Sequence, residues 1–179
     1  MILTRAAVRF SAPDYYVMHR LNRWRPPRPI RAWMLAASRA GDGWLWWCCG
    51  LAVLASNDSY RHQAFAAAAL AVLTGILTFK ILKRAVGRKR PCAIETHCWA
   101  TLLPPDQFSF PSGHSITAFA VTGALSTFYP WALPVLLFCA VSVAASRVLL
   151  GMHFLSDVVA GSALGACLGY GAALLLSTI

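Results

Sequence analysis

The sequence predicts an all-α integral-membrane helical bundle, and three observations carry that prediction: its hydropathy, the length of its apolar runs and the placement of its charges. Hydrophobic residues make up 58% of the 179 residues, charged residues make up 12%, and the mean hydropathy is +0.58. A small soluble domain could hardly stay in solution with this balance, so the expected solvent is a bilayer. No linker or repeat divides the chain, and residues 1–179 are expected to form a single domain.

Basic residues are clustered at two places. Eight arginines precede residue 43, and six basic residues lie between Lys80 and Arg90, within a net charge of +10. In a soluble protein this charge could bind nucleic acid, but here the clusters flank apolar runs. They therefore indicate topology signals and contacts with anionic lipids, and no nucleic-acid partner is expected. Residues 1–29 are expected to form a basic interfacial arm with a short helix around Tyr15–Trp24.

Five apolar segments follow the arm, and they predict five transmembrane helices. They lie at residues 43–56, 63–82, 112–129, 131–148 and 158–179. The first is shorter than the ~20 residues of a bilayer crossing, so it must tilt or borrow upstream residues, and a sixth span results if residues 30–40 also enter the membrane. Gly161, Gly165 and Gly169 recur every four residues, which predicts close packing of the last helix. Asp42, between two glycines, either caps the first helix or contacts the site formed by the polar elements described next.

Three short polar elements remain once the spans are placed, and each falls at a predicted membrane boundary. They are Lys83-x6-Arg90-Pro91, then Pro111-Ser112-Gly113-His114, then Ser146-Arg147-x5-His153-x3-Asp157. Together they occupy residues 80–160, and the catalytic site is therefore expected at the membrane–water interface.

The third element contains a candidate nucleophile. His153 and Asp157 are four residues apart, so at the start of the last helix they would share a face, and the carboxylate could accept the proton of one imidazole nitrogen. The other nitrogen would then be unprotonated and able to attack. A buried structural histidine beside a helix-capping aspartate is the alternative interpretation of this pair alone.

The second element suits phosphate binding. Ser112 and Gly113 before a helix supply a cap, close backbone approach and free amides at the positive end of the helix dipole. His114, one step inside the helix, could give a proton to a leaving oxygen as general acid. Taken alone, the same four residues would also fit an ordinary capped helix start.

Lys83, Arg90 and Arg147 add positive charge around the same place. A phosphoryl group in transition spreads negative charge over its equatorial oxygens, so cations and amides can stabilise it where other phosphatases use metal ions. Lys83 and Arg90 could instead reach the interface simply by snorkelling. Arg147 closes a long apolar helix, where a charge is costly unless it meets water, a partner or a ligand.

Taken together and in this order, the three elements resemble the signature of the type 2 phosphatidic acid phosphatase superfamily, which also includes bacterial class A acid phosphatases and vanadium haloperoxidases. The resemblance implies an all-helical fold, commonly with six spans, and hydrolysis of a lipid phosphate monoester or diphosphate through a phosphohistidine intermediate, without a metal or another cofactor. It implies that His153 is the nucleophile, Asp157 its orienting acid and His114 the general acid. The implied phosphate cradle consists of Lys83, Arg90, Ser112, Gly113 and Arg147.

Two other functions stay open at the level of sequence. The haloperoxidases hold vanadate in a similar cradle, and a non-catalytic membrane protein could use one to bind phospholipid headgroups. The membrane-like composition and the presence of both histidines and Asp157 favour a membrane lipid phosphatase. Phosphatidic acid, phosphatidylglycerol phosphate, undecaprenyl diphosphate, a polyprenyl-linked sugar phosphate and a lipid A phosphate all remain candidate substrates.

The expected location is a bacterial inner membrane. With five spans the basic arm and the catalytic loop share a face, which the positive-inside tendency would make cytoplasmic; with six spans the site can face outward while the arm stays inside. Cys92 and Cys98 could form a disulfide only in an oxidising compartment, which favours a periplasmic or outer site.

Overall fold

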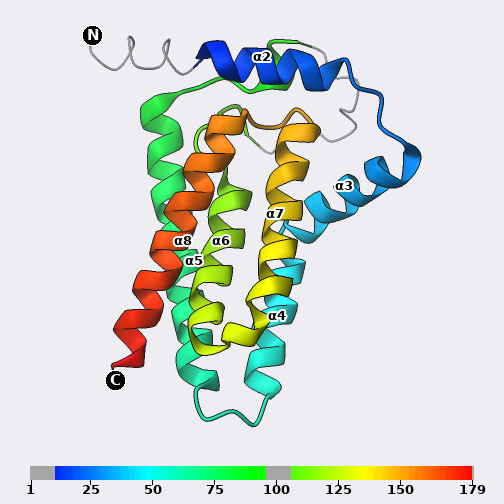
Figure 1. The fold of residues 1–179 in the computed structure, drawn as a ribbon. Coiled ribbons are helices and arrows are strands. Elements are labelled where there is room, and N and C mark those ends of the chain that lie inside the picture. Colours follow the sequence, from blue (N-terminus) through cyan, green and yellow to red (C-terminus); the bar gives the residue numbers. More distant parts are fainter. Residues whose placement is uncertain (1–10, 96–105, 179) are drawn as a thin grey trace.

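The computed structural model describes residues 11–95 and 106–178, and over these residues the protein is built from helices (Figure 1). The helices are α2 (Ser11–Asn22), α3 (Arg28–Ala40), α4 (Trp44–Ala55), α5 (Arg61–Val86), α6 (Gly113–Phe128), α7 (Leu133–Leu149) and α8 (Leu155–Ser177), with short 3-10 turns at Pro91–Ala93 and Pro130–Ala132. In the described ranges, extended pairing is limited to one isolated bridge between Lys89 and Phe108. The predicted all-α class is confirmed.

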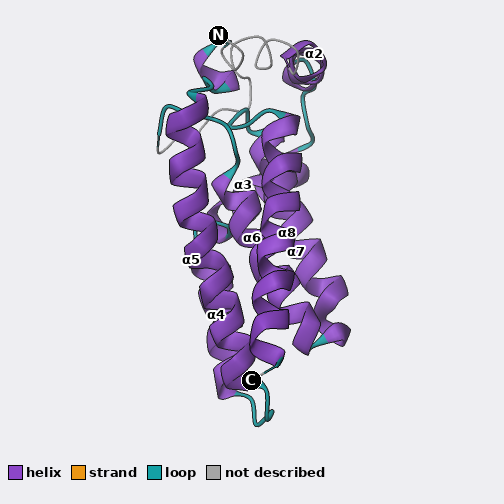
Figure 2. Ribbon diagram, turned by 90° about the vertical axis from the view of Figure 1, so that its left-hand side faces the viewer, coloured by secondary structure: helices purple, strands orange, loops and turns teal. Residues whose placement is uncertain are grey.

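Helices α4 to α8 run side by side along one axis, and α2 lies across the end of the bundle (Figures 1 and 2). The core of the bundle consists largely of small side chains, among them Ala67 and Ala71 of α5 and Ala120 and Ala124 of α6, all fully buried. Small residues let helix backbones approach closely where lipid supplies no hydrophobic driving force between helices. The helix predicted around Tyr15–Trp24 is α2.

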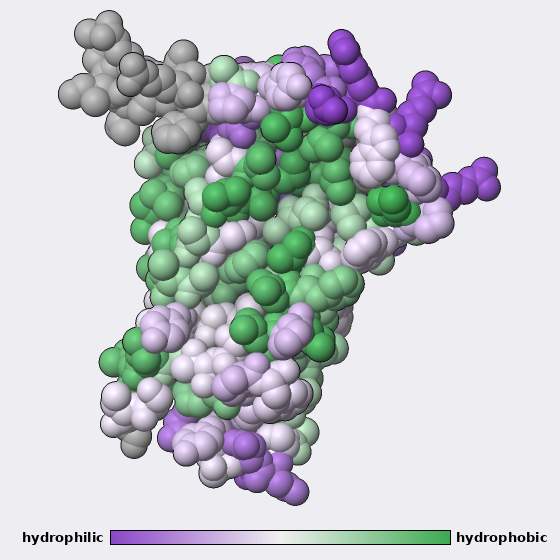
Figure 3. Space-filling model, in the orientation of Figure 1, coloured by the Kyte–Doolittle hydropathy of each residue, from purple (hydrophilic) through white to green (hydrophobic). Residues whose placement is uncertain are grey.

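The bundle carries an apolar outer surface. Three helical segments are long and apolar enough to cross a membrane by themselves: α5, residues Pro130–Leu149 and α8. Helix α4 is apolar but has 12 residues, and α6 has 16. Figure 3 shows apolar side chains over the middle of the molecule and polar ones toward its two ends. The protein is therefore an integral membrane protein.

The first crossing of the bundle is broken. Helix α3 slants inward from the edge of the molecule, and after the turn at residues 41–43 α4 continues to the far end (Figure 1). Residues 30–40 thus extend α4 instead of adding a separate crossing. Asp14 of α2 binds Arg88 and Ser156, so the described part of the arm lies on the same face as the catalytic loop. This matches the five-span arrangement, and the separation of arm and site that six spans would give is not observed.

Helices α6 and α8 pack in close contact through glycines. A Cβ atom at Gly161 would lie 2.7 Å from the carbonyl oxygen of Ser112, and Cβ atoms at Gly165 and Gly169 would collide with the backbone of α6. The close packing predicted from the glycine repeat is confirmed. One result is that the amide of Ser112 donates a 3.1 Å hydrogen bond to the carbonyl oxygen of Asp157, which fixes the starts of α6 and α8 relative to each other.

Candidate active site

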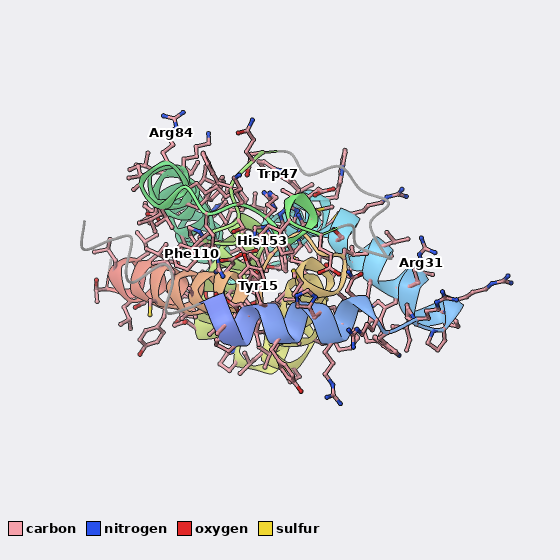
Figure 4. The ribbon with its side chains drawn as sticks, turned by 90° about the horizontal axis from the view of Figure 1, so that it is seen from above. Tyr15, Arg31, Trp47, Arg84, Phe110 and His153 are labelled. Atoms are coloured by element: carbon pink, nitrogen blue, oxygen red, sulfur yellow. The ribbon has the colours of Figure 1, made fainter. Side chains whose placement is uncertain are left out.

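The three sequence elements converge at the end of the bundle near α2. Lys83 lies in the last turn of α5, His114 in the first turn of α6 and Arg147 in the last turn of α7, whereas Arg90 and His153 lie in the loops between helices. All five side chains line one cavity of about 520 Å³. Figure 4, which views this end from above, shows His153 close to the middle of the bundle, with α2 crossing beside it.

His153 is held by two partners that fix its tautomer. Its Nδ1 lies 2.6 Å from the carbonyl oxygen of Ser109, and its Nε2 lies 3.1 Å from Nη1 of Arg90. A carbonyl can only accept and a guanidinium can only donate, so Nδ1 carries the proton and Nε2 presents a lone pair. The residue is 2% exposed and lines the cavity.

The expected direct contact between His153 and Asp157 is not what the structure shows. Oδ2 of Asp157 lies 3.7 Å from Nδ1, too far for a hydrogen bond, and the acceptor is Ser109 instead. The reason is that α8 begins at Leu155, so His153 precedes the helix and the i, i+4 rule does not apply. The His153 amide instead donates to the carbonyl oxygen of Arg147, following the turn at Gly151, where φ is +69°.

Asp157 supports His153 indirectly. Its Oδ2 accepts a 2.9 Å hydrogen bond from the Phe154 amide, which caps the start of α8, and its Oδ1 accepts a 2.7 Å hydrogen bond from Arg88. Arg88 also pairs with Asp14 at 2.7 Å and lies 4.1 Å above the ring of Phe154. The carboxylate thus anchors the loop that carries His153 and places a negative charge beside it.

Sequence reasoning missed Arg88, Asp14 and the role of Ser109. Arg88 is one of the six unspecified residues between Lys83 and Arg90, and its contact with Asp14 joins positions 74 residues apart. No local pattern marks such a tertiary pair. The acceptor on Ser109 is a backbone carbonyl, which every residue possesses, so the side-chain sequence could not reveal it.

Asp106 lies between two of the predicted cradle cations. Its carboxylate accepts hydrogen bonds from Lys83 at 2.6 Å and from Arg90 at 2.8 Å, and its carbonyl oxygen accepts a third from Arg90. Burial alone would raise the pKa of Asp106, but the hydrogen bonds and charges of Lys83 and Arg90 hold that pKa below its ordinary value. Asp106 is therefore an anion that binds two of the cations predicted to hold phosphate.

Arg147 has unused hydrogen-bonding capacity. The residue is 3% exposed, and its Nη1 donates a 2.6 Å hydrogen bond to Ser38 of α3. Its buried Nε has no acceptor within the described parts of the chain. An unsatisfied buried donor is costly, and because Arg147 lines the cavity, an anionic oxygen entering there could satisfy it.

The start of α6 is a helix N-terminus beside the cavity. Ser112 is fully buried, and its Oγ accepts hydrogen bonds from the amide and hydroxyl of Ser115, so this side chain caps the helix instead of facing the cavity. The amides of Gly113 and His114 have no acceptor in residues 11–95 and 106–178. Gly113 lines the cavity, so the phosphate-binding amides expected here are available from Gly113 onward and not from Ser112.

The basicity of His153 is strongly reduced. Burial, together with the positive charges of Arg90 and Arg147, lowers its pKa to about 4 against the opposing influence of Asp157. At neutral pH the imidazole is therefore neutral, and its Nε2 lone pair accepts the hydrogen bond from Arg90.

The family model of the PAP2 superfamily matches residues 60–178, a range that contains all eight predicted site residues. The chain belongs to the PAP2 superfamily, which confirms the resemblance seen in the three sequence elements.

Curated relatives of this chain are bacterial phosphatases. It is 37% identical over 99 residues to a lipid A 1-phosphatase of Rhizobium johnstonii, a match to 53% of this chain and 40% of the relative. It is 44% identical over 110 residues to a decaprenylphosphoryl-5-phosphoribose phosphatase of Mycobacterium tuberculosis, covering 59% and 53% of the two chains. It is 38% identical over 103 residues to phosphatidylglycerophosphatase B of Bacillus subtilis, covering 51% and 48%. The chain spans about half the length of the curated relatives it matches.

Solved structures share the fold. A transmembrane PAP2-type phosphatidylglycerolphosphate phosphatase from Bacillus subtilis superimposes with a TM-score of 0.77 at 24% identity, covering 99% of this chain and 92% of that one. LpxE of Aquifex aeolicus superimposes with a TM-score of 0.76 at 22% identity, covering 94% and 96%. At 24% and 22% identity, these two comparisons show a shared fold and nothing further.

Proposed function

We propose that this protein hydrolyses a lipid phosphate monoester or diphosphate through a phosphohistidine intermediate at the membrane–water interface. The observation that carries the proposal is the placement of His153. Partners on both ring nitrogens fix the imidazole, with the Nε2 lone pair on the side of Arg90, and the residue lines a cavity that is also lined by Lys83, Arg90 and Arg147.

The arrangement supports a two-step displacement. Nε2 of His153 attacks phosphorus, the bond from phosphorus to the leaving oxygen breaks, and His114 gives that oxygen a proton. Water then attacks the phosphohistidine, gives a proton back to His114, and inorganic phosphate leaves with His153 restored. Lys83, Arg90, Arg147 and the amides at the start of α6 neutralise the equatorial oxygens, so no metal ion is required in this scheme.

The shape of the cavity supports a substrate with a long apolar tail. Its lining on α5 extends from Phe65 to Lys83, a rise of about 27 Å at 1.5 Å per residue, close to the ~30 Å thickness of a bilayer core. Away from the polar end the walls are apolar, and Trp47 and Leu73, which are exposed on the outer surface, connect the cavity to the lipid-facing side between α4 and α5. The names of the relatives refer to phosphatases of several different lipids. All the candidate substrates named in the sequence analysis therefore remain to be tested.

The test is phosphate release by the detergent-purified protein from a panel of lipid phosphates and diphosphates in the presence of a chelator. The wild type is expected to release phosphate and, after rapid quenching, to carry an acid-labile, base-stable phosphoryl group. His153→Ala is expected to lose both signals. His62→Ala is the matched control, because His62 is exposed at the opposite end of the bundle.

Three results would contradict the proposal. Vanadate-dependent halide oxidation without phosphate release would place the chain with the haloperoxidases, and headgroup binding without turnover would identify a lipid-binding protein. Phosphate release that disappears with the chelator and survives His153→Ala would contradict the mechanism.

For location, we propose a bacterial inner membrane with the site on its outer face. Because α2 and the site share one face, this orientation requires the basic arm to lie outward as well, against the positive-inside tendency. The disulfide that favours the outer face stays a prediction, since Cys98 lies outside the described residues. Thiol labelling of Cys92 and Cys98 in native membranes tests it, and two free thiols would remove this support.

A further inference from the structure

Asp42 contacts the proposed general acid. Its Oδ1 lies 2.7 Å from Nε2 of His114, a contact between positions 72 residues apart, and both residues line the cavity. The start of α4 has Gly43 as its N-cap, with no side-chain hydrogen bond to the helix. Of the two roles that the sequence left open for Asp42, the structure therefore shows contact with the site and not helix capping.

The turn that carries Asp42 is shaped to bring it close to the imidazole. A Cβ atom at Gly41 would lie 2.6 Å from Cγ1 of Val143 and 3.2 Å from Cδ2 of His114, so a larger residue would push the turn away. Gly43 has φ of +130°, a conformation that residues with side chains rarely adopt. Glycine on both sides of Asp42 thus permits an approach that other residues would block.

The charges around His114 explain why a carboxylate is needed there. Burial opposes a positive imidazole most strongly, the charges of Arg147 on α7 and Lys83 on α5 oppose it as well, and Asp42 favours it. Asp106 is the other carboxylate at this end of the cavity, but it is already bound to Lys83 and Arg90. Within the described residues, Asp42 is the carboxylate that hydrogen-bonds to His114.

We propose that Asp42 is the positioning residue of the general acid: it holds Nε2–H of His114 and leaves Nδ1–H to donate to the leaving oxygen. This inference rests on the proposed function. In the first step the Nδ1 proton moves to the oxygen as the phosphorus–oxygen bond breaks, and the imidazole stays neutral with Nε2–H bound to Asp42. In the second step Nδ1 takes a proton from the attacking water, which restores the imidazolium.

The experiment compares two leaving groups in single-turnover release. Dodecyl phosphate leaves as an alkoxide that must be protonated, whereas 4-nitrophenyl phosphate leaves as a stable phenolate that needs no proton. Asp42→Asn is expected to slow dodecanol release by about 10²-fold, the scale of general acid catalysis, and to slow nitrophenol release by less than about threefold. Asp42→Glu, which keeps the carboxylate, is expected to recover part of the lost rate.

Two comparisons make the result decisive. His114→Ala should show the same dependence on leaving group as Asp42→Asn, and Asp58→Asn, which alters an exposed carboxylate in the loop between α4 and α5, should match the wild type. Equal slowing of both substrates by Asp42→Asn, or slowing of neither, would overturn the proposal. In either case a phosphoenzyme that depends on His153 would leave the proposed function intact, so the two failures can be told apart.

Discussion

His153 illustrates how its surroundings set the chemistry of a single residue. With its pKa lowered to about 4 by burial and by the nearby arginines, the free imidazole stays neutral over the range in which an exposed histidine would become charged. We therefore expect the acid limb of kcat/KM that His153 controls to fall near pH 4. A pH–rate profile, with a control in which detergent is saturating at each pH, checks this. An acid limb near pH 6.5 would contradict it.

The same shift links folding to pH. In the unfolded chain His153 titrates near its ordinary value of 6.5, and in the folded protein near 4, so between these values the unfolded state binds more protons. The contribution of His153 to the free energy of unfolding is therefore complete above about pH 6.5 and is lost as the pH falls toward 4. Variant His153→Ala should show a weaker loss of thermal stability over this window.

Asp106 offers a second test at the scale of one residue. Its carboxylate hydrogen-bonds to Lys83 and Arg90, so an entering phosphate analogue must share or displace it. Asp106→Asn is expected to strengthen inhibition by orthovanadate at least about threefold, or ~0.7 kcal/mol, with Asp58→Asn as the control. Weaker inhibition would mean that Asp106 chiefly organises the two cations for substrate.

At the scale of elements, the contact between α6 and α8 gives an internally controlled prediction. A Cβ atom at Gly165 would collide with the backbone of Ile116, whereas one at Gly171 would meet nothing within 4 Å. Gly165→Ala is therefore expected to destabilise the protein by about 2 kcal/mol or more, and Gly171→Ala to be neutral or stabilising by about 0.5 kcal/mol. Thermal unfolding in detergent measures both, and equal midpoints for the two variants would contradict the packing described.

Helix α2 contributes a charge to the interior of the site. Asp14 is 5% exposed and pairs with Arg88, which in turn binds Asp157. Asp14→Asn removes one of the two carboxylates that compensate Arg88, so we expect a loss of about 1–3 kcal/mol and a lower kcat. The comparison is with Asp58→Asn, measured for both unfolding midpoint and turnover. An unchanged kcat would show that α2 lies beside the site without supporting it.

Much of the whole molecule could be predicted from sequence because membrane helices obey simple local rules. Apolar length placed α5, α7 and α8 within a few residues, and the glycine repeat identified the face of α8 that packs closely. The spacing of the polar elements predicted six residues that line the cavity, since each element marks one end of a predicted helix, whereas Ser112 and Asp157 do not line it. These features depend on neighbours in the sequence.

What could not be predicted depends on contacts between distant segments. The helix-face argument failed for His153 because the exact start of α8 decides which residues belong to the helix. The burial of Ser112 depends on its bonds to Ser115 and Asp157, and the position of Asp42 over His114 depends on how α3 and α4 meet. Local periodicity carries no information on these.

Helix α8 starts beside the site at Leu155 and runs to the opposite end of the bundle, where Ser177 lies (Figure 1). A reporter enzyme fused after residue 179 would therefore sit across the bilayer from the catalytic cavity. If a reporter that works only in the cytoplasm is active in this fusion, the cavity faces the outside. If a reporter that works only in the periplasm is active, the cavity faces the cytoplasm. The side of the membrane from which the substrate enters can thus be determined with a colour assay for the reporter on colonies, before the substrate is known.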